Sequence, residues 1–597
     1  MDAVLEDATI HQRRQTLHKM TRGFGLEDAY STTLSRIREQ KGNKAKIGME
    51  ALMWISRCER LLKAPELCHA LAVEVGTTDL SVHNIPSIRT LLSCTLGLVT
   101  IDEQESTARL VHFTLQEYFA AHPNLFITTH SMMAEICLTY LHFRSICELP
   151  TTLDTIPSTT PFLHYASCHW GFHARKEMTG VVKHLAIGHL ERDANHISAD
   201  ILLREKSVKL LSRWDCLTGR HPDLQGFTGL HCITYMGVTD IAIDMLNMKR
   251  WDLNGRDSKG ATPLIWAAKH GNFTLAKLLL EQGDVNPTLS DKKGLTALKH
   301  AAKAGQVEVV KLLLEREDVD PDPSDGSGRT PLSYAAESAH EGVVKILLER
   351  GDVNPDSSGQ YDRTPLSYAA EAGDEGLVKI LLERGDVNPD PSDEYGMTPL
   401  LYAAERGHEV VAKILLERED VNPDSSDMGG RTPLFFAAGG GCVGLIKMLL
   451  EREDVGPDPP AATGQTPLSS AAQSGHEDVV KMLLEQEDVE PDLWDEDGRT
   501  PLSYAAQFGY EGVVKILLER GHVDPDSCYA DDRTPLSYAA EYGHEGVVKI
   551  LLEQGYADPP WDDGDGQTPL SYAAESGHQG VVNMLLHHMD VYPDSSD

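Results

Sequence analysis

A threonine recurs every 34 residues through the second half of the chain. The positions are Thr262, Thr296, Thr330, Thr364, Thr398, Thr432, Thr466, Thr500, Thr534 and Thr568, and one further step back lands on Thr228. Five copies read Thr-Pro-Leu-Ser-Tyr-Ala-Ala, and most of the others differ from it at one to three positions. A fixed period of roughly 20 to 50 residues is typical of stacked repeats, which present an extended surface rather than one enclosed pocket. The period therefore predicts a solenoid whose role is binding.

One unit, residues 364–397, shows why each repeat should be a pair of helices. Thr364 is a good helix N-cap, and the proline after it suits the first helical turn. A short helix with a small-residue face should end at Gly373, and a second, apolar helix over 377–382 should end at Gly385. Residues 386–397, rich in aspartate and proline, predict a polar hairpin-like loop, here called the finger. Neither helix can bury its apolar face alone, so the units must stack.

The wording of the repeat distinguishes two helical families with similar periods. Tetratricopeptide repeats need an early Trp and Leu-Gly, and they lack a long Asp/Pro loop. Thr-Pro-Leu-x-x-Ala-Ala followed by Gly-His and Val-Val-x-x-Leu-Leu resembles ankyrin repeats instead, over about residues 225–597. The Gly-His pairs are Gly407-His408, Gly475-His476, Gly543-His544 and Gly577-His578. The resemblance implies an all-α solenoid of about eleven repeats.

Two departures from the ankyrin pattern stand out. The family's usual His after Thr-Pro-Leu is Ser in most copies, which changes one loop-pinning hydrogen bond. The period is 34 rather than about 33 residues, and the additional residue falls in the finger. The copy at Thr228, Thr-Gly-Leu-His, is degenerate and is expected to cap the array.

Residues 28–145 carry a different pattern. The predicted elements are helices over 27–41, 48–62, 64–73 and 85–96, strands over 98–102 and 108–113, and a helix over 116–121. Helices followed by a small β-hairpin is the order of a winged helix, so this domain is predicted to be winged-helix-like. The remaining predicted regions are an N-terminal tail over 1–27, a helical connector over 146–220 with a helix over 161–176, and the solenoid over 221–597.

Short motifs in this region also resemble a known context. They are Met53-Trp54-Ile55-Ser56, Pro65-Glu66-Leu67-Cys68-His69-Ala70-Leu71, Pro86-Ser87-Ile88 and the run from Val111 to Tyr118. In this order they resemble the segment that follows the NTPase module in fungal NACHT–ankyrin proteins, which are intracellular NLR-like receptors of the STAND class. The resemblance covers about residues 28–180 and implies the sensor portion of such a receptor.

The nucleotide-binding module of those receptors is not expected in this chain. A P-loop needs Gly-x-x-x-x-Gly-Lys-Ser/Thr, because backbone amides and the lysine hold the phosphates. The nearest text, residues 255–262, has Ala261 in place of the lysine and lies in a repeat loop. We therefore expect either a truncated relative or an incomplete gene model, and no nucleotide hydrolysis.

The charge of the repeats constrains their partners. The whole chain carries −37, and residues 251–597 account for −36 of it, from 28 Lys+Arg and 64 Asp+Glu. Such a surface repels phosphate groups, which argues against nucleic acid or an anionic membrane as the main partner. It favours a basic protein partner.

Cysteine usage and hydropathy indicate the compartment. Eight of the ten cysteines precede residue 233 and no Cys-x-x-Cys occurs, which is typical of reduced, intracellular proteins. The start of the chain does not read as a signal peptide. The longest apolar-leaning run, residues 90–101, is about half of the ~20 residues that a membrane span needs. The expected location is the cytoplasm, with the nucleus as the alternative.

Candidate chemical sites give way to structural interpretations. His164, Cys168, His169 and His173 have spacing that could hold a metal, but an amphipathic connector helix anchored by Trp170 explains them better. The segments 492–498 and 562–566 resemble calcium loops but lack a Glu at the twelfth position. The Gly-His histidines of neighbouring repeats lie ~10 Å apart and so share no site. No catalytic, cofactor or metal site is predicted, and the protein is predicted to be non-enzymatic.

The recurring aromatics and charges point to a binding face. One tyrosine per repeat, as in Tyr334 and Tyr504, is expected to pack between repeats. The ankyrin resemblance implies a concave face built from the residue before each Thr, the two residues after Ala-Ala and the finger tips. The first two sets are here interleaved Arg and Glu. The C-terminal third adds aromatics beside Arg, a composition typical of interface hot spots. The predicted protein-binding residues are Trp494, Arg499, Phe508, Tyr529, Arg533, Tyr542 and Trp561.

Three functions are compatible with these features. The favoured one is protein–protein recognition as the sensor portion of an NLR-like receptor. A transcription-linked regulator would place the winged helix on DNA, but its wing, Asp102-Glu103-Gln104-Glu105, is acidic. An adaptor that presents substrates to an enzyme complex would need an accessory motif that the sequence does not show.

Overall fold

The computed structural model describes residues 24–102, 104–150, 155–192, 196–210, 225–519, 523–525, 533–553 and 566–591. The chain divides into two compact units, Met1–Ala297 and Leu298–Asp597. Both are built almost entirely of helices. Among the described residues, no helix is both long enough and apolar enough to cross a membrane.

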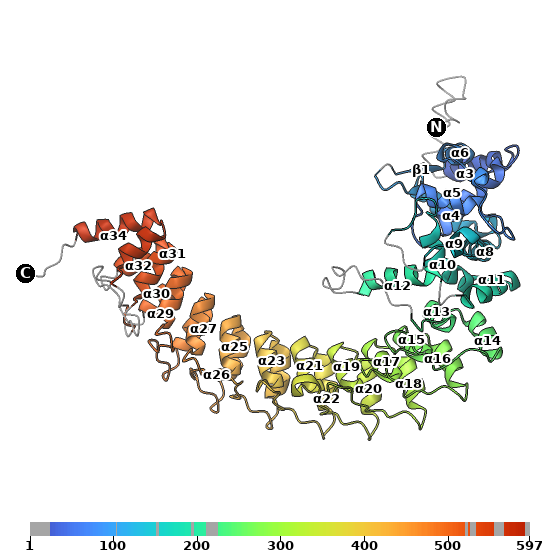
Figure 1. Cartoon of the computed structure of the whole chain (residues 1–597). Helices are drawn as coiled ribbons and strands as arrows, with labels where there is room; N and C mark the ends of the chain where they lie inside the picture. Colours follow the sequence, from blue (N-terminus) through green and yellow to red (C-terminus); the bar gives the residue numbers. More distant parts are fainter. Residues whose placement is uncertain are drawn as a thin grey trace, which may run out of the picture. The chain divides into compact units, whose positions relative to one another are not determined.

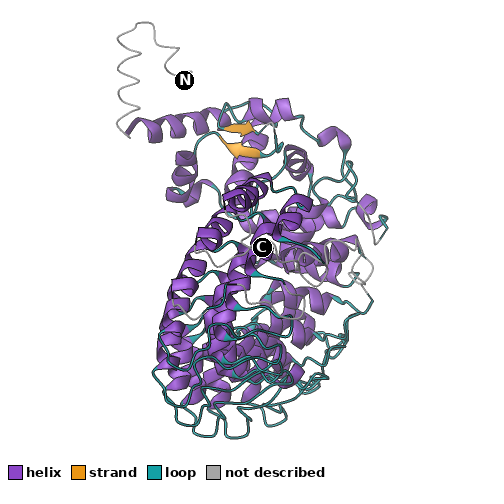
Figure 2. Ribbon diagram, turned by 90° about the vertical axis from the view of Figure 1, so that its left-hand side faces the viewer, coloured by secondary structure: helices purple, strands orange, loops and turns teal. Residues whose placement is uncertain are grey.

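Unit 1 begins with helices and one small hairpin. Its elements up to residue 210 are α3 (Phe24–Arg38), α4 (Lys44–Arg57), α5 (Ala64–Ala72), η1 (Val82–Asn84), α6 (Ile88–Cys94), β1 (Val99–Ile101), β2 (Ala108–Leu110), α7 (Phe113–Ala121), η2 (Pro123–Leu125), α8 (Thr129–Leu141), α9 (Arg144–Cys147), α10 (Leu163–Lys176), α11 (Gly180–Leu190) and α12 (Ile197–Leu210). Strands β1 and β2 pair antiparallel, with Val99 opposite Leu110, and appear in orange in Figure 2. A single bridge between Lys63 and Thr107 extends the hairpin.

The order of helices followed by a hairpin agrees with the sequence prediction, while the winged-helix assignment itself stays a prediction. Two expected boundaries were wrong. Helix α4 ends at Arg57 rather than residue 62, because Cys58 adopts an extended conformation with φ −70° and ψ 152°. Phe113 starts α7 rather than ending a strand, because the His112 side chain accepts the Thr114 amide and caps that helix.

The core of unit 1 is aromatic. Trp54 on α4 is fully buried, and its ring lies edge-on to Phe162 and Tyr165, with centroids 5.5 and 5.8 Å away. Trp170 on α10 is also buried, as expected for the anchor of a connector helix. Helix α10 packs along α8, so the predicted connector is part of a compact helical body.

The rest of both units consists of helix pairs. Unit 1 continues with α13 (Gly229–Met236), α14 (Thr239–Asn247), α15 (Pro263–Lys269) and α16 (Phe273–Leu280). Unit 2 contains α17 (Ala297–Lys303), α18 (Val307–Leu314), α19 (Pro331–Glu337), α20 (Glu341–Leu348), η5 (Gln360–Asp362), α21 (Pro365–Ala372), α22 (Glu375–Leu382), α23 (Pro399–Glu405), α24 (Glu409–Leu416), α25 (Pro433–Gly440), α26 (Val443–Leu450), α27 (Pro467–Ser474), α28 (Glu477–Leu484), α29 (Pro501–Phe508), α30 (Glu511–Glu519), α31 (Pro535–Tyr542), α32 (Glu545–Glu553), α33 (Pro569–Glu575) and α34 (Gln579–Val591). Eleven pairs, α13/α14 to α33/α34, therefore occur in the described residues. Within unit 2, successive pairs pack in chain order (Figure 1).

The pair α21/α22 shows how the sequence sets the unit. The Thr364 hydroxyl accepts the Ser367 amide at 3.3 Å and caps α21, and Gly373 ends the helix in the left-handed region with φ 71°. Asp374 caps α22 by accepting the Leu377 amide at 3.0 Å. The prediction that Gly385 ends α22 was wrong. The helix ends at Leu382. After it, the Arg384 amide bonds to the Leu381 carbonyl, three residues back, instead of to the carbonyl four residues back.

Neighbouring repeats are joined by a histidine of the Gly-His position. His408 Nε2 lies 3.0 Å from the Glu371 carbonyl of the preceding repeat. The same bond joins His340 to Lys303, His476 to Gly439 and His544 to Gln507, at 2.8 to 3.2 Å. Each of these histidines therefore ties two units together.

Candidate protein-binding surface

Four arginines that directly precede a capping threonine, Arg329, Arg363, Arg499 and Arg533, each lie near the rings of two tyrosines. The Arg363 guanidinium carbon is 4.4 Å from the ring centre of Tyr368 in its own repeat and 4.3 Å from that of Tyr402 in the next. Arg533 has the same relation to Tyr538 and Tyr572, at 4.4 and 4.3 Å. Since guanidinium groups bind ring faces favourably, each arginine bridges two repeats.

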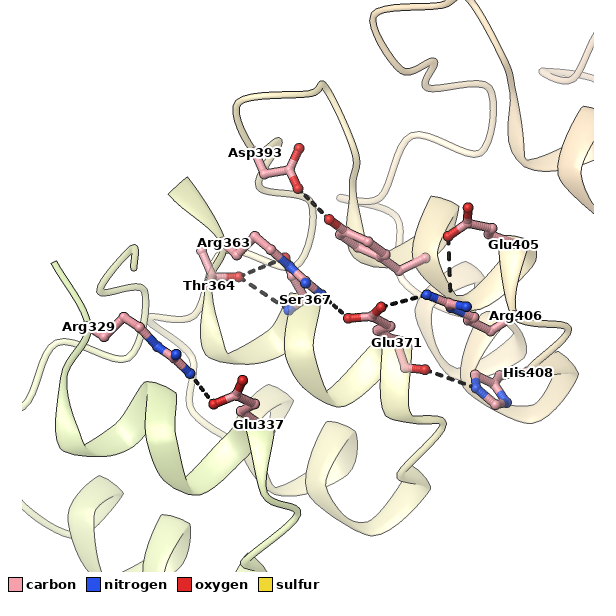
Figure 3. A network of polar contacts seen from close by, with 11 residues as sticks. Arg329, Glu337, Arg363, Thr364, Ser367, Glu371, Asp393, Glu405, Arg406 and His408 are labelled. Atoms are coloured by element: carbon pink, nitrogen blue, oxygen red, sulfur yellow. Dashed lines mark hydrogen bonds and ion pairs between the residues drawn. The ribbon is translucent and has the colours of Figure 1, made fainter. Parts of the chain in front are cut away.

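Three of these arginines, Arg329, Arg363 and Arg533, form ion pairs with glutamates at the ends of the first helices, and Figure 3 shows the first two pairs. Glu371 accepts hydrogen bonds from Arg363 and, at 2.8 Å, from Arg406 of the next repeat. Burial alone would raise the pKa of Glu371, but these two guanidinium groups lower it overall. The predicted interleaving of Arg and Glu is therefore a chain of mutual ion pairs, so much of its charge is satisfied within the protein.

The tyrosines are held from their hydroxyl ends by the fingers. Tyr402 donates to Asp393 Oδ2 at 2.5 Å, and Asp393 Oδ1 accepts the amides of Tyr395 and Met397 at 2.9 Å. The pairs Tyr334–Asp325 and Tyr504–Asp495 repeat this bond at 2.7 and 2.5 Å. Burial, followed by the bond to Asp495, raises the pKa of Tyr504 to about 12.

These tyrosines are core residues, as the sequence predicted. The buried members are Tyr334, Tyr368, Tyr402, Tyr504 and Tyr538. Their rings fill the space between repeats, and the hydroxyls of Tyr334, Tyr402 and Tyr504 also fix a finger. A partner therefore reaches this face through other side chains.

Two predicted site residues stand out at the ends of first helices. Phe508, the last residue of α29, is 45 % exposed, and Tyr542, the last residue of α31, is 49 % exposed. Gln507 Nε2 donates to the Tyr542 hydroxyl at 3.4 Å, so Tyr542 reaches the neighbouring repeat. The Phe508 ring stacks on Tyr510 and the Tyr542 ring on His544, with centroids 6.3 and 6.4 Å apart.

The other predicted residues have different surroundings. Trp494 is 53 % exposed and lies in the finger before α29. Arg499 lies 5.7 and 5.8 Å from the ring centres of Tyr504 and Tyr538, and Arg533 is bound to Glu541, so both arginines also serve the packing of repeats. Tyr529 and Trp561 lie outside the described residues.

Comparison with protein-family models agrees with this geometry. The model described as "Ankyrin repeats (3 copies)" matches residues 174–291, 283–357, 366–461, 421–493, 445–527 and 521–597, which together exceed half of the chain. The chain belongs to the ankyrin-repeat family. The first match starts inside α10, upstream of residue 221 where the sequence placed the solenoid. Comparison with curated proteins found no similar sequence.

Membership has a direct functional meaning at a coarse level. Ankyrin arrays are scaffolds for protein–protein interaction and are generally non-enzymatic binding modules. In this ankyrin array the arginines, tyrosines and histidines of the repeat are used mainly to join the units. The residues that depart from the repeat are therefore the ones to consider for binding.

The candidate metal residues on α10 have protein partners. His173 is buried, with Nδ1 2.9 Å from His130 Nδ1 and Nε2 2.9 Å from the Tyr165 hydroxyl. Burial lowers the pKa of His173 to about 3, so this histidine is neutral. Among the described residues no group of three or more His, Cys, Asp or Glu has metal-binding geometry.

The calcium-like segment and the hairpin also use their charges internally. Asp492 Oδ2 accepts the Asp524 amide at 2.6 Å, and Asp495 accepts the amides of Asp497 and Arg499. In the hairpin, Arg109 forms ion pairs with Asp102 at 3.4 Å and Glu105 at 2.6 Å. Because both carboxylates already neutralise Arg109, this side chain gives no support to DNA binding by the hairpin.

The sequence-based selection missed a second set of exposed apolar residues. Tyr361, Tyr395 and Met428 lie at the tips of three consecutive fingers and are all exposed. Their signal in the sequence was a reversed tip motif at 359–362, Gly-Gln-Tyr-Asp, where most fingers read Asp-x-x-Gly.

Proposed function

We propose that the ankyrin array binds a basic protein partner through Phe508 and Tyr542, with Trp494 at the edge of the site. The observation that carries this proposal is the exposed aromatic pair at one equivalent position of adjacent repeats. In the other repeats of unit 2 the same position holds small or polar residues, namely Ala304, Ser338, Ala372, Arg406, Gly440, Ser474 and Ser576.

The two rings suit a binding role. Each one is held on one face by the residue two positions later, so little side-chain freedom is lost on binding. Exposed aromatics of this kind often dominate interface energies. The surrounding repeats are strongly acidic, which favours a basic partner through electrostatic complementarity.

The proposal is tested by affinity purification and mass spectrometry with two variants. Phe508→Ser/Tyr542→Ser removes the aromatic pair, and Val410→Ser removes an exposed apolar residue of α24 as a matched control. We expect a set of proteins that wild type and Val410→Ser retain and that the double variant loses, with unchanged circular dichroism. Equal recovery by all three proteins contradicts the proposed site.

We further propose that the array is the sensor portion of a fungal NLR-like receptor that acts in the cytoplasm. The ordered motifs from Met53 to Tyr118 support this assignment, as does a hairpin that follows four helices in the described residues of unit 1. The test is the sequence of full-length transcripts. An in-frame P-loop upstream of Met1 supports a receptor, whereas an in-frame stop codon directly upstream contradicts it.

A further inference from the structure

The finger that precedes α21 breaks the rule followed by its neighbours. The tips at 257–260, 291–294, 325–328, 393–396, 427–430 and 495–498 all read Asp-x-x-Gly. Their glycines adopt φ between 72° and 81°, where side chains are disfavoured. At 359–362 the order is Gly-x-x-Asp, and both Tyr361 and Asp362 take positive φ, 65° and 60°.

This reversal sacrifices two local advantages. A bulky residue in the left-handed region is a strained exception. The finger also lacks the aspartate that elsewhere accepts the buried tyrosine, as Asp393 does for Tyr402. Strain of this kind persists where it serves a function, and here its visible result is the position of Tyr361.

Tyr361 lies against Tyr395 of the next finger, and Met428 occupies the tip of the finger after that. The ring centroid of Tyr361 lies 5.7 Å from that of Tyr395, at an interplanar angle of 46°. Tyr361 is 47 %, Tyr395 52 % and Met428 77 % exposed. We call these three residues the tip cluster.

The backbone fixes the tip cluster in place. The Glu394 amide donates to the Tyr361 carbonyl and the Met428 amide to the Tyr395 carbonyl, both at 2.9 Å. Successive tips are therefore joined like adjacent strands, and the two rings are presented on a pre-organised support.

The electrostatics of the tip cluster differ from those of the inner tyrosines. Tyr334, Tyr368 and Tyr402 each lie under an arginine of the chain. Within the described ranges, no Lys or Arg lies over Tyr361 or Tyr395, and no cation pairs with the exposed carboxylates of Asp362 and Glu394. Two open ring faces beside two carboxylates form a place for a cation supplied from outside.

We propose that the tip cluster binds an arginine side chain of a basic, extended segment of a partner protein. The guanidinium group stacks on Tyr361 or Tyr395, as the chain's own Arg363 does on Tyr368 at 4.4 Å. Asp362 and Glu394 supply the opposite charge, and Met428 contacts the apolar stem of the arginine. The residues differ from those proposed above, so this site stands or falls independently of Phe508 and Tyr542.

The test uses the full-length protein with methyl-labelled methionines and a defined probe. The probe is an acetylated, amidated heptapeptide in which arginine alternates with glycine, and its control replaces each arginine with neutral citrulline. Met428→Leu assigns the Met428 signal. We expect a saturable shift of that signal with the arginine peptide and none with the citrulline peptide.

Variants separate specific recognition from attraction to a generally acidic surface. Tyr361→Gly relieves the strained backbone, so its thermal midpoint should rise, yet combined with Tyr395→Ser it should weaken peptide binding by about tenfold. Asp362→Asn/Glu394→Gln should weaken binding and reduce its salt dependence. Phe273→Ser, which removes an exposed aromatic at the start of α16, should leave the affinity unchanged.

Two results overturn the proposal. One is a Met428 signal that stays in place while the protein is saturated with the arginine peptide. The other is equal affinity of wild type and Tyr361→Gly/Tyr395→Ser, which would show that net charge alone attracts the peptide. A citrulline peptide that binds as well as the arginine peptide also contradicts recognition of a cation.

Discussion

Replacement of Asp458 by asparagine should stabilise the array at neutral pH. Burial raises the pKa of Asp458 from 3.8 to about 6, and the hydrogen bonds from the Leu468 amide, at 3.0 Å, and the Thr466 side chain only partly oppose it. One pKa unit corresponds to about 1.4 kcal/mol, so the ionised carboxyl disfavours folding by roughly 3 kcal/mol. Asparagine keeps the acceptor oxygen and the shape without the charge.

The pH dependence gives this prediction a definite sign. Since the folded-state pKa of Asp458 lies above the unfolded value, its penalty is present above about pH 6 and disappears as the pH falls toward about 4. The gain from Asp458→Asn should therefore be full at pH 7.5 and close to zero at pH 4. Urea unfolding followed by circular dichroism measures the gain, and hydrogen exchange in 445–470 locates it.

A matched control is four residues away. Asp454 is bound by Arg452 at 2.8 Å, and that hydrogen bond lowers its pKa, so Asp454→Asn should bring no gain at pH 7.5. A less stable Asp458→Asn at neutral pH, or a gain independent of pH, would refute the reasoning about the buried carboxyl.

Three further changes test how the repeats are built and joined. A Cβ on Gly512 would overlap the Glu477 carboxylate of the preceding repeat, so Gly512→Ala should stabilise the array by about 1 kcal/mol more in a Glu477→Ala background than in wild type; an additive double-mutant cycle would contradict this. His544→Ala removes the 2.8 Å bond to the Gln507 carbonyl and should cost about 1–2 kcal/mol in denaturant unfolding, and no loss would show that the bond is dispensable. Thr500→Ala removes a helix cap and should cost about 1 kcal/mol, measured in the same way, whereas Thr500→Ser should be nearly neutral.

The regular part of the fold could be predicted because the residues that start and end each helix recur in most repeats. Threonine caps, proline at the first helical position and glycine after the first helix are local signals, and the helices follow them closely. The burial of Tyr334 and Tyr504 could also be predicted, since one aromatic per period needs a place between units. Local signals failed where a neighbouring segment decides, as at Cys58, where the chain leaves α4 early.

The site was harder to predict because its arginines look alike in the sequence. Arg499 and Arg533 are of a residue type that is common in interfaces, yet each lies against tyrosines of two repeats. The spacing of residues within one repeat does not reveal such a contact with the next repeat. Tyr361 was missed for the opposite reason. Tyr361 lies in a tip motif with the order Gly-x-x-Asp instead of Asp-x-x-Gly. This reversal is recognised only when the fingers are aligned and their backbone angles are compared.

The histidine bonds and the arginine bridges have a mechanical consequence. In unit 2 each of them joins one repeat to its immediate neighbour, as His408 does with Glu371 and Arg363 with Tyr402. Resistance to a pulling force should then be distributed over many similar junctions in series. When one junction gives way it releases 34 residues, about 115 Å of extended chain, so an array pulled from its end should lengthen in equal steps, as a spring made of separate coils.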